Sequence, residues 1–307
     1  EIGSGLVGSE MCIRDSSYIV PKWCFAVFML FIVLAYEAVN ILFYRQNEQK
    51  DTRISVYGFI IVISCFLQAM FGVVQFFGFF QISTTLWVTG SFDNPAGFAA
   101  CLCAGFPFVG FLLSDSNKYI RYVGGLIGFV IVIAVILSQS RAGIMSIAFI
   151  CFILLNMKFF HKRWVKYLSL LCFALLLSGC YWMKKDSADG RLLIWRCSVS
   201  MVKDAPWLGH GIGSFEARYM DYQADYFRQY GLNRYSMLAD NVKHPFNEYL
   251  GVLLNFGFVG LLMILALITL LIYCYKKHPC AEKRIAFCSL ISIGVFSFFS
   301  YTFTYPF

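Results

Sequence analysis

Residues able to carry chemistry are concentrated in one polar stretch, Lys184 to Gly260, about a quarter of the 307-residue chain. Its most distinctive pieces are Gly190-Arg191-Leu192-Leu193-Ile194-Trp195, Gly209-His210-Gly211-Ile212-Gly213 and His244-Pro245-Phe246-Asn247-Glu248. Histidine has an unperturbed pKa of about 6.5, and burial can raise the pKa of a carboxylate into the same range. His244 and Glu248 are therefore candidate general bases, His244 the better one by pKa and Glu248 the more firmly placed if a helix begins here.

Two arginines are candidate ligands for a phosphate group. Arg141 interrupts an apolar run, within Ser138-Gln139-Ser140-Arg141-Ala142-Gly143. Arg191 opens a helix predicted from about 191 to 204, and helical spacing places it on the largely apolar side with Trp195, Ser198 and Val202. A charge near hydrocarbon needs a partner, and the guanidinium fork matches phosphate oxygens. The structural alternatives are a snorkelling arginine at 141 and an ion pair at 191.

The rest of the polar stretch has structural as well as functional interpretations. Pro206 ends the predicted helix. The face opposite Arg191 is polar and carries Arg196, Ser200, Lys203 and Asp204. Glycines 209–213 could present amides to a phosphate, but a tight turn is the default because no strand precedes them, and His210 is then a loop residue. Segment 216–235 alternates aromatic and polar groups, as in an interfacial helix or a sugar-contacting surface. Asp93, in the loop 90–98, is a turn or capping residue or a site carboxylate.

Composition places the chain in a membrane. Hydrophobic residues make up 59% and charged residues 14%, which leaves a water-soluble globule nowhere to bury its apolar surface. The 12 Cys are scattered without a CxxC pair, so they predict neither a zinc site nor a disulfide framework. The net charge of +8 is not gathered into a dense basic run, and binding of nucleic acid is not expected.

Eight apolar runs approach the ~20 residues of a bilayer crossing. Their limits are about 19–44, 54–80, 97–113, 120–138, 143–158, 165–182, 248–275 and 285–305. The predicted fold is all-α, a polytopic membrane helical bundle with one large extracytoplasmic loop. Its regions are an adaptor-like, non-native tail over 1–16, transmembrane helices over 17–182, a loop with an amphipathic helix over 183–247, and transmembrane helices over 248–307. The tail and the apolar end at Phe307 predict a fragment of a longer protein.

Basic residues predict the orientation. Segments 45–53, 114–121, 158–166 and 276–284 hold thirteen Lys and Arg, whereas 81–95 and 138–142 hold only Arg141. By the positive-inside rule the first set is cytoplasmic, and the long loop 183–247 lies outside. Merging the fourth and fifth spans would break this alternation, so they are predicted to be separate helices.

Five pieces in this order resemble the O-antigen ligase and O-antigen polymerase family, bacterial enzymes that use polyprenyl-diphosphate-linked glycans. They are Gly90-Ser91-Phe92-Asp93-Asn94-Pro95, Ser140-Arg141-Ala142-Gly143, Arg191 with Trp195, Gly209-His210-Gly211-Ile212-Gly213, and Asn247-Glu248-Tyr249-Leu250 leading to Gly257-Phe258-Val259-Gly260. The resemblance covers most of the chain.

The resemblance implies an inverting membrane glycosyltransferase of lipopolysaccharide or polysaccharide biosynthesis that needs no metal or cofactor. The donor would be an undecaprenyl-diphosphate-linked glycan and the acceptor a lipid A-core or a growing glycan. The site would face the periplasm from the bacterial inner membrane, among membrane lipids. Arg141, Arg191 and Asn247 would bind the diphosphate, and His244, Glu248 and Arg191 would be the catalytic residues.

One position departs from the family pattern, which has His directly before the Asn. Phe246 stands there, and His244 lies two residues earlier. Two helical positions turn a side chain by about 200°, so His244 can take that role only if 244–246 are not helical. A transporter or flippase of lipid-linked sugars is the alternative function. It is the weaker one, because Glu37 alone lies well inside a predicted span, whereas transporter sites cluster near mid-membrane.

Overall fold

The computed structural model describes residues 50–79, 88–158, 163–183, 185–277 and 281–301. The predicted tail 1–16 and the predicted span 19–44 lie outside these residues. The chain divides into two compact units, residues 1–53 with 306–307 and residues 54–305, and the second holds the site. Every regular element among the described residues is a helix, which confirms the predicted all-α class.

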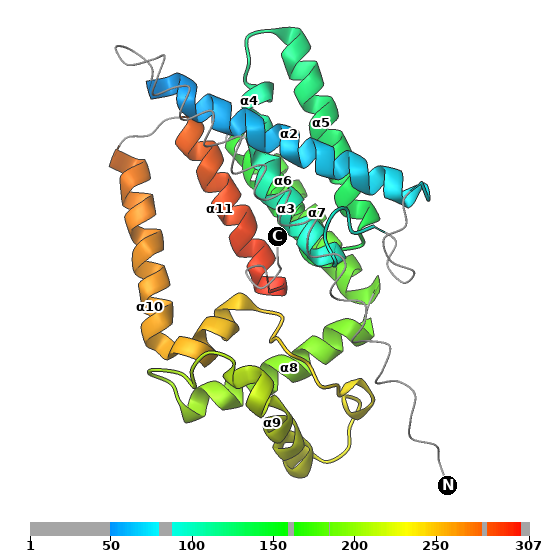
Figure 1. Ribbon diagram of the computed structural model, residues 1–307, viewed down its shortest axis with the longest axis vertical. Helices are drawn as coiled ribbons and strands as arrows, with labels where there is room; N and C mark the ends of the chain where they lie inside the picture. Colours follow the sequence, from blue (N-terminus) through cyan, green and yellow to red (C-terminus); the bar gives the residue numbers. More distant parts are fainter. Residues whose placement is uncertain (1–49, 80–87, 159–162, 184, 278–280, 302–307) are drawn as a thin grey trace. The chain divides into compact units, whose positions relative to one another are not determined.

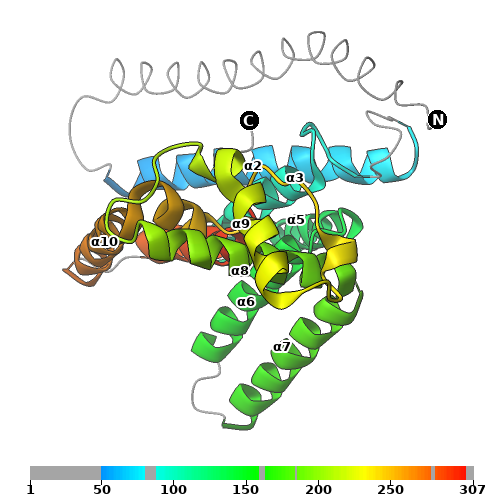
Figure 2. The same cartoon turned by 90° about the horizontal axis from the view of Figure 1, so that it is seen from below.

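The helices outside the polar stretch follow the predicted apolar runs. In chain order they are α2 (Lys50–Phe76), α3 (Pro95–Gly105), the 3-10 helix η1 (Phe106–Phe108), α4 (Val109–Leu113), α5 (Lys118–Leu137), α6 (Arg141–Lys158), α7 (Arg163–Met183), α8 (Lys185–Asp204), α9 (Ser214–Tyr230), η2 (Ser236–Leu238), α10 (Glu248–Lys277) and α11 (Ala281–Phe299). Figure 1 shows α8, α9 and the start of α10 together at the end of α11, and Figure 2 shows α6 and α7 as neighbouring helices.

Several helices can cross a membrane, so the chain is a multi-pass membrane protein. Within the described residues, four segments are long and apolar enough by length and composition: Tyr57–Phe76, Pro95–Leu113, Lys118–Leu137 and Glu248–Lys277. Arg141–Asn156 and Trp164–Gly179 are shorter apolar helices. The prediction of eight spans is thus confirmed in part. The third predicted span, 97–113, is not one regular helix, because Pro107 in η1 has no amide hydrogen to donate.

The polar residues between α5 and α6 end one helix and start the next. The Ser138 hydroxyl donates to the Val135 carbonyl at 2.7 Å, and Gln139 adopts a positive φ of 53°. The Ser140 hydroxyl then accepts the Gly143 amide at 3.3 Å and caps α6. The fourth and fifth predicted spans are therefore separate helices, as the charge pattern required.

Hydroxyl groups join three of the apolar helices. Ser146 of α6 donates to the Ser292 carbonyl of α11 at 2.7 Å, and the Ser292 hydroxyl donates to the Cys103 carbonyl of α3 at 2.8 Å. Ser289 donates to the Ala104 carbonyl. Such bonds let helices pack closely in hydrocarbon, where burial of apolar surface adds little attraction. They hold the middle of α11 against α3 and α6.

A second core holds the polar unit together. Leu193, Cys197 and Met201 of α8 pack with Phe215 and Tyr219 of α9, and all five are buried. The predicted faces of α8 are confirmed: the 196, 200, 203 and 204 side is exposed and the opposite side is buried or half-buried. The predicted start at 191 is wrong, because α8 begins at Lys185. Asp186 in its first turn favours the helix dipole, and tertiary packing outweighs the low propensity of Gly190.

Candidate active site

Arg191 and Trp195 lie one turn apart on α8 and hold two other segments in place. The guanidinium Nη1 of Arg191 donates to the Phe299 carbonyl at the end of α11, at 2.6 Å. The Trp195 indole Nε1 donates to the Pro245 carbonyl at 3.0 Å. Both bonds use backbone carbonyls that have no intrahelical donor, one at the end of a helix and one in a turn at a proline. Residues far apart in sequence therefore meet on one face of α8.

The segment from His244 to Asn247 is not helical, which satisfies the condition set by the sequence for His244. Phe246 has a φ of 51°, a left-handed conformation that is uncommon for a bulky residue. Its ring lies under the Arg191 guanidinium, with 5.1 Å between the guanidinium carbon and the ring centroid. The residue that departs from the family pattern thus contacts the arginine, and Pro245 precedes the helix, which begins at Glu248.

His244 lies against an aromatic ring at the edge of this turn. Its imidazole centroid is 4.6 Å from the centroid of Tyr301, with 31° between the ring planes. Burial, opposed by Glu216 and aided by Lys243, lowers the pKa of His244 below its usual 6.5. The imidazole is therefore neutral near pH 7 and able to accept a proton.

Tyr301 and the Phe299 carbonyl are site components that the sequence did not indicate. The Tyr301 ring also meets the Phe246 ring edge-on, with centroids 5.1 Å apart. Both residues lie within the predicted apolar run 285–305 and carry no spacing that would mark them. Only the contact between the end of α11 and α8 brings them to the turn.

Arg141 reaches the same helix from the start of α6. Its Nη2 donates to the Ser187 hydroxyl at 2.7 Å. Ser187 precedes Arg191 by four residues, so the two share one face of α8. The structure therefore brings Arg141 to within about one helical turn of Arg191 along that face. Ser187 escaped the sequence prediction because α8 was expected to start after it.

Asn247 and Glu248 form the start of α10. The buried Asn247 side chain accepts the Leu250 amide at 3.0 Å, which is a capping bond. Glu248 is the first residue of the helix and is half-buried. Its carboxylate is thus carried by a rigid element, whereas His244 belongs to the turn that precedes it.

The glycine-rich loop is paired with a break in α10. At Gly257 the chain leaves helical geometry, with φ 61° and ψ −159°. The amides of His210 and Gly211 donate to the Leu254 and Asn255 carbonyls at 2.7 and 3.2 Å. In the other direction, the amides of Phe258 and Val259 donate to the Pro206 and Trp207 carbonyls at 2.8 and 3.2 Å. The loop therefore satisfies the backbone groups that the break exposes.

The glycine-rich loop 209–213 and the motif 257–260 are thus held together by one set of backbone hydrogen bonds. The amides of His210 and Gly211 that a phosphate could have used are occupied by α10, which supports the turn interpretation of 209–213. The backbones approach so closely that a Cβ on Gly209 would lie 2.6 Å from the Leu254 carbonyl oxygen. A Cβ on Gly257 would overlap the Trp207 carbonyl. Glycine is required at both positions.

His210 has a defined tautomer within this loop. The Arg218 guanidinium contacts its Nδ1 at 3.0 Å, and Nε2 contacts the Met201 carbonyl at 2.7 Å. An arginine can only donate, so Nδ1 accepts and Nε2 carries the proton. Both ring nitrogens have protein partners, which makes His210 a residue of the loop scaffold.

Replacing Gly257 by Ala should destabilise the protein by about 2 kcal/mol or more, since positive φ and the carbonyl overlap act together. Gly211→Ala is the matched control: its φ is 89°, but its Cβ would meet nothing within 4 Å. Thermal unfolding in detergent should show a clearly larger fall in midpoint for Gly257→Ala. Equal midpoints for the two variants would mean that the loop does not pack into the break.

The loop containing Asp93 is held by glutamines of α2. The Gln75 side-chain oxygen accepts the Thr89 and Gly90 amides, both at 2.9 Å, and Gln68 donates to the Ser91 hydroxyl at 2.7 Å. The capping residue of α3 is Asn94, which accepts the Ala96 amide at 2.8 Å, so capping does not explain Asp93. Asp93 is exposed.

The gathered groups combine positive charge with a neutral base. Arg191 on α8, and Arg141, which bonds to Ser187 of the same helix, supply guanidinium donors suited to an oxyanion. His244, Phe246 and Tyr301 line the neighbouring turn. Such an arrangement can hold a phosphorylated leaving group while a base accepts a proton from a hydroxyl.

Comparison with known proteins identifies the domain that contains most of these groups. Searches of curated proteins and of solved structures found no significant match. The family model described as O-antigen ligase matches residues 126–265, which include Arg141, Arg191, His244 and the Gly257 break. Residues 126–265 of this chain are therefore an O-antigen ligase domain, of the family that the sequence motifs resemble.

Proposed function

We propose that the protein transfers a glycan from a polyprenyl-diphosphate donor to a hydroxyl of a lipid or glycan acceptor. The observation that carries this proposal is the position of Arg191, which bonds to the end of α11 and covers the Phe246 ring inside an O-antigen ligase domain. Enzymes of this family use lipid-linked glycans, so an anionic diphosphate must be held beside the acceptor. Whether the acceptor is a lipid A-core or a growing glycan decides between ligase and polymerase.

In this proposal Arg141 and Arg191 bind the diphosphate. The bond from Arg141 to Ser187, one turn before Arg191, supports a shared site. In the bonds described above, they donate to a hydroxyl and to a backbone carbonyl. A diphosphate would offer several charged oxygens and stronger bonds to the same forks. Asn247, which caps α10 with its side-chain oxygen, would contribute from the adjoining turn.

His244 is the proposed base for the acceptor hydroxyl. The diphosphate is already a good leaving group, so the remaining requirement is activation of the nucleophile. The acceptor oxygen attacks the anomeric carbon as the bond to the diphosphate breaks, and its proton passes to the base. The lowered pKa of His244 keeps it unprotonated for this role. Glu248, four residues on and fixed in α10, is the second candidate.

The proposed orientation places residues 183–247 outside the bacterial inner membrane and 276–284 inside. The break at Gly257 supports it, because residues 258–277 then form a helix of ~30 Å, enough to cross the hydrocarbon core. Trp207, next to the break, is 70% exposed and suits the outer interface.

A cysteine placed at position 203 in a cysteine-free background should react in intact cells with a membrane-impermeant maleimide. A cysteine at position 276 should react only after permeabilisation. Lys203 and Lys276 are both exposed lysines near a helix end, so they form a matched pair. The reverse pattern would move the site to the cytoplasm and remove the periplasmic assignment.

A transfer assay separates the enzyme from a transporter of lipid-linked sugars. Purified protein in detergent is incubated with a radiolabelled donor, with and without acceptor. The enzyme should release polyprenyl diphosphate as labelled glycan joins the acceptor. A transporter has no barrier to work across in detergent and would leave the sugar–phosphate bond intact. An intact donor, under conditions where the protein stays folded, would reject the proposal.

A further inference from the structure

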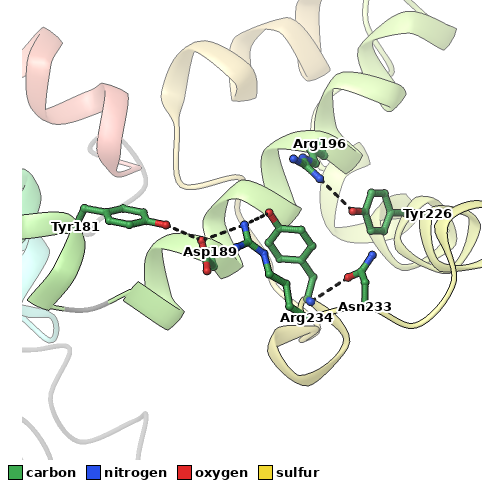
Figure 3. Close-up of polar contacts among 7 residues, drawn as sticks. Tyr181, Asp189, Arg196, Tyr226, Asn233 and Arg234 are labelled. Carbon is green, nitrogen blue, oxygen red and sulfur yellow. Dashed lines mark hydrogen bonds and ion pairs between the residues drawn. The ribbon is translucent and has the colours of Figure 1, made fainter. Parts of the chain in front are cut away.

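Two arginines, two tyrosines and an aspartate that have no part in the proposed transfer form a charged cluster. Figure 3 shows Arg196 of α8 beside Tyr226 of α9, and Arg234 beside Asp189. The guanidinium carbons of Arg196 and Arg234 lie 5.3 and 4.8 Å from the centroid of the same Tyr235 ring. They are therefore within about 10 Å of each other. We call these five residues the Tyr235 cluster.

The Tyr235 cluster carries more positive than negative charge. Asp189 is its only carboxylate; it is buried, accepts the Tyr181 hydroxyl at 3.1 Å and lies 3.8 Å from Arg234. Within the described part of the chain Arg196 forms no ion pair, and it donates to the Tyr226 hydroxyl at 3.2 Å. Two permanent cations next to one carboxylate leave a net positive charge. An added anion would balance it.

Two other basic residues in the segment 185–247 are paired with carboxylates. Arg228 pairs with Asp225 at 2.9 Å, and Lys243 pairs with Glu216 at 3.6 Å. Residues 185–247 hold eight Lys and Arg and seven Asp and Glu, so this segment as a whole is nearly neutral. A broad basic surface of the kind that binds anionic lipid is absent from this segment. The Tyr235 cluster therefore has a local excess of positive charge within a nearly neutral segment.

The Tyr235 cluster is also open to a ligand and adjoins aromatic rings. The Arg234 side chain is 62% exposed, and Arg196 is exposed as well. The Tyr226 ring lies 4.9 Å from that of Tyr230, which is exposed. Aromatic rings present an apolar face together with a hydroxyl, which suits the alternating faces of a sugar, and guanidinium forks bind carboxylate and phosphate.

We propose that the Tyr235 cluster binds an acidic sugar, bearing a carboxylate or phosphate, in the glycan substrate. Arg196 and Arg234 would hold the anionic group while Tyr226 and Tyr230 contact the ring. This inference rests on the proposed glycan transfer for its biological meaning. It assigns a substrate class, since the protein would favour glycans that contain acidic residues.

Binding of tetragalacturonate to the purified full chain in phosphatidylcholine nanodiscs tests this directly. The fully methyl-esterified tetrasaccharide is the matched neutral probe. We expect at least about tenfold weaker binding of the ester, and a similar loss for the acid with Arg196→Gln or Arg234→Gln. Arg228→Gln, which removes an exposed arginine that has its own partner, should change the dissociation constant less than twofold. Added salt should weaken binding of the acid.

Equal affinity for the acid and its ester in the unmodified protein would overturn the proposal, whatever the variants do. So would unchanged binding in folded Arg196→Gln and Arg234→Gln proteins. Nanodiscs with about 30% phosphatidylglycerol provide the lipid arm: if that lipid abolishes tetragalacturonate binding in competition, the cluster is a lipid headgroup site. Arg191→Ala and His244→Ala should retain tetragalacturonate binding, so failure of transfer and failure of this site are distinguishable.

Discussion

His244→Ala should lower glycan transfer by about a hundredfold while Glu248→Gln remains within about threefold of the unmodified protein. A positioned general base contributes about 10²–10⁴-fold, and the alanine variant removes it without changing the diphosphate site. His244 lies in the non-helical turn, with its ring against Tyr301 and its pKa lowered by burial. Rates are to be measured with purified, folded variants at saturating donor and acceptor.

The pH profile provides a second readout of the same base. A lowered pKa means that His244 is unprotonated at pH 7. The transfer rate should therefore be at its plateau at pH 7 and fall only below about pH 6.5. Because the pKa of His244 is lower in the folded state than in the unfolded state, the free energy of unfolding decreases as the pH falls toward the folded pKa. The thermal midpoint must therefore be measured in parallel. Lys243→Gln removes a cation that lowers this pKa, and should move the acid limb to higher pH at an unchanged plateau rate.

The opposite outcome would assign the base to the helix. If His244→Ala keeps activity within about threefold while Glu248→Gln loses about a hundredfold, the acceptor proton goes to Glu248. Its position as the first residue of α10 would explain the choice, since a carboxylate on a rigid element is the better placed of the two.

Arg191→Lys should lose roughly ten- to a hundredfold in transfer efficiency although the charge is kept. The lysine cannot span two phosphate oxygens, and charge-assisted bonds contribute about 1.5–3 kcal/mol each. The effect should fall on the donor's kcat/KM and leave the acceptor's KM unchanged. Arg228→Lys is the matched control, because Arg228 is an exposed arginine paired with Asp225.

Arg141→Ala should affect the same donor parameter, and a double-mutant cycle should show coupling between the two arginines. Residues that bind one diphosphate lose less together than the sum of their separate losses. Arg191 also holds the Phe299 carbonyl, so the thermal midpoint of each variant is required. Full activity in a folded Arg191→Ala protein would remove the arginine from the mechanism.

The sequence predicted most helices well because crossing a membrane imposes a direct requirement on length and apolarity. The separation of α5 from α6 followed from Arg141 and the charge alternation, and the structure shows the two serine bonds that produce it. The start of α8 was missed because residues 185–190 are polar and include a glycine. Helicity there depends on tertiary contacts, such as those of the buried Asp189 with Tyr181.

The parts of the site made by backbone contacts could not be predicted. The loop 206–211 pairs with the break in α10 through main-chain groups, which leave no pattern apart from the two glycines. Tyr301 joins the turn only because the end of α11 contacts α8. In contrast, the side of α8 that carries Arg191 and Trp195 followed from helical spacing alone.

The position of the diphosphate tests the account most directly. A cryo-electron microscopy structure of the protein with undecaprenyl diphosphate should place both phosphates within about 3 Å of the guanidinium nitrogens of Arg141 and Arg191, beside the 244–247 turn. Phosphates bound to other cations, such as Arg196 and Arg234, or located between the apolar helices, would contradict the proposed active site.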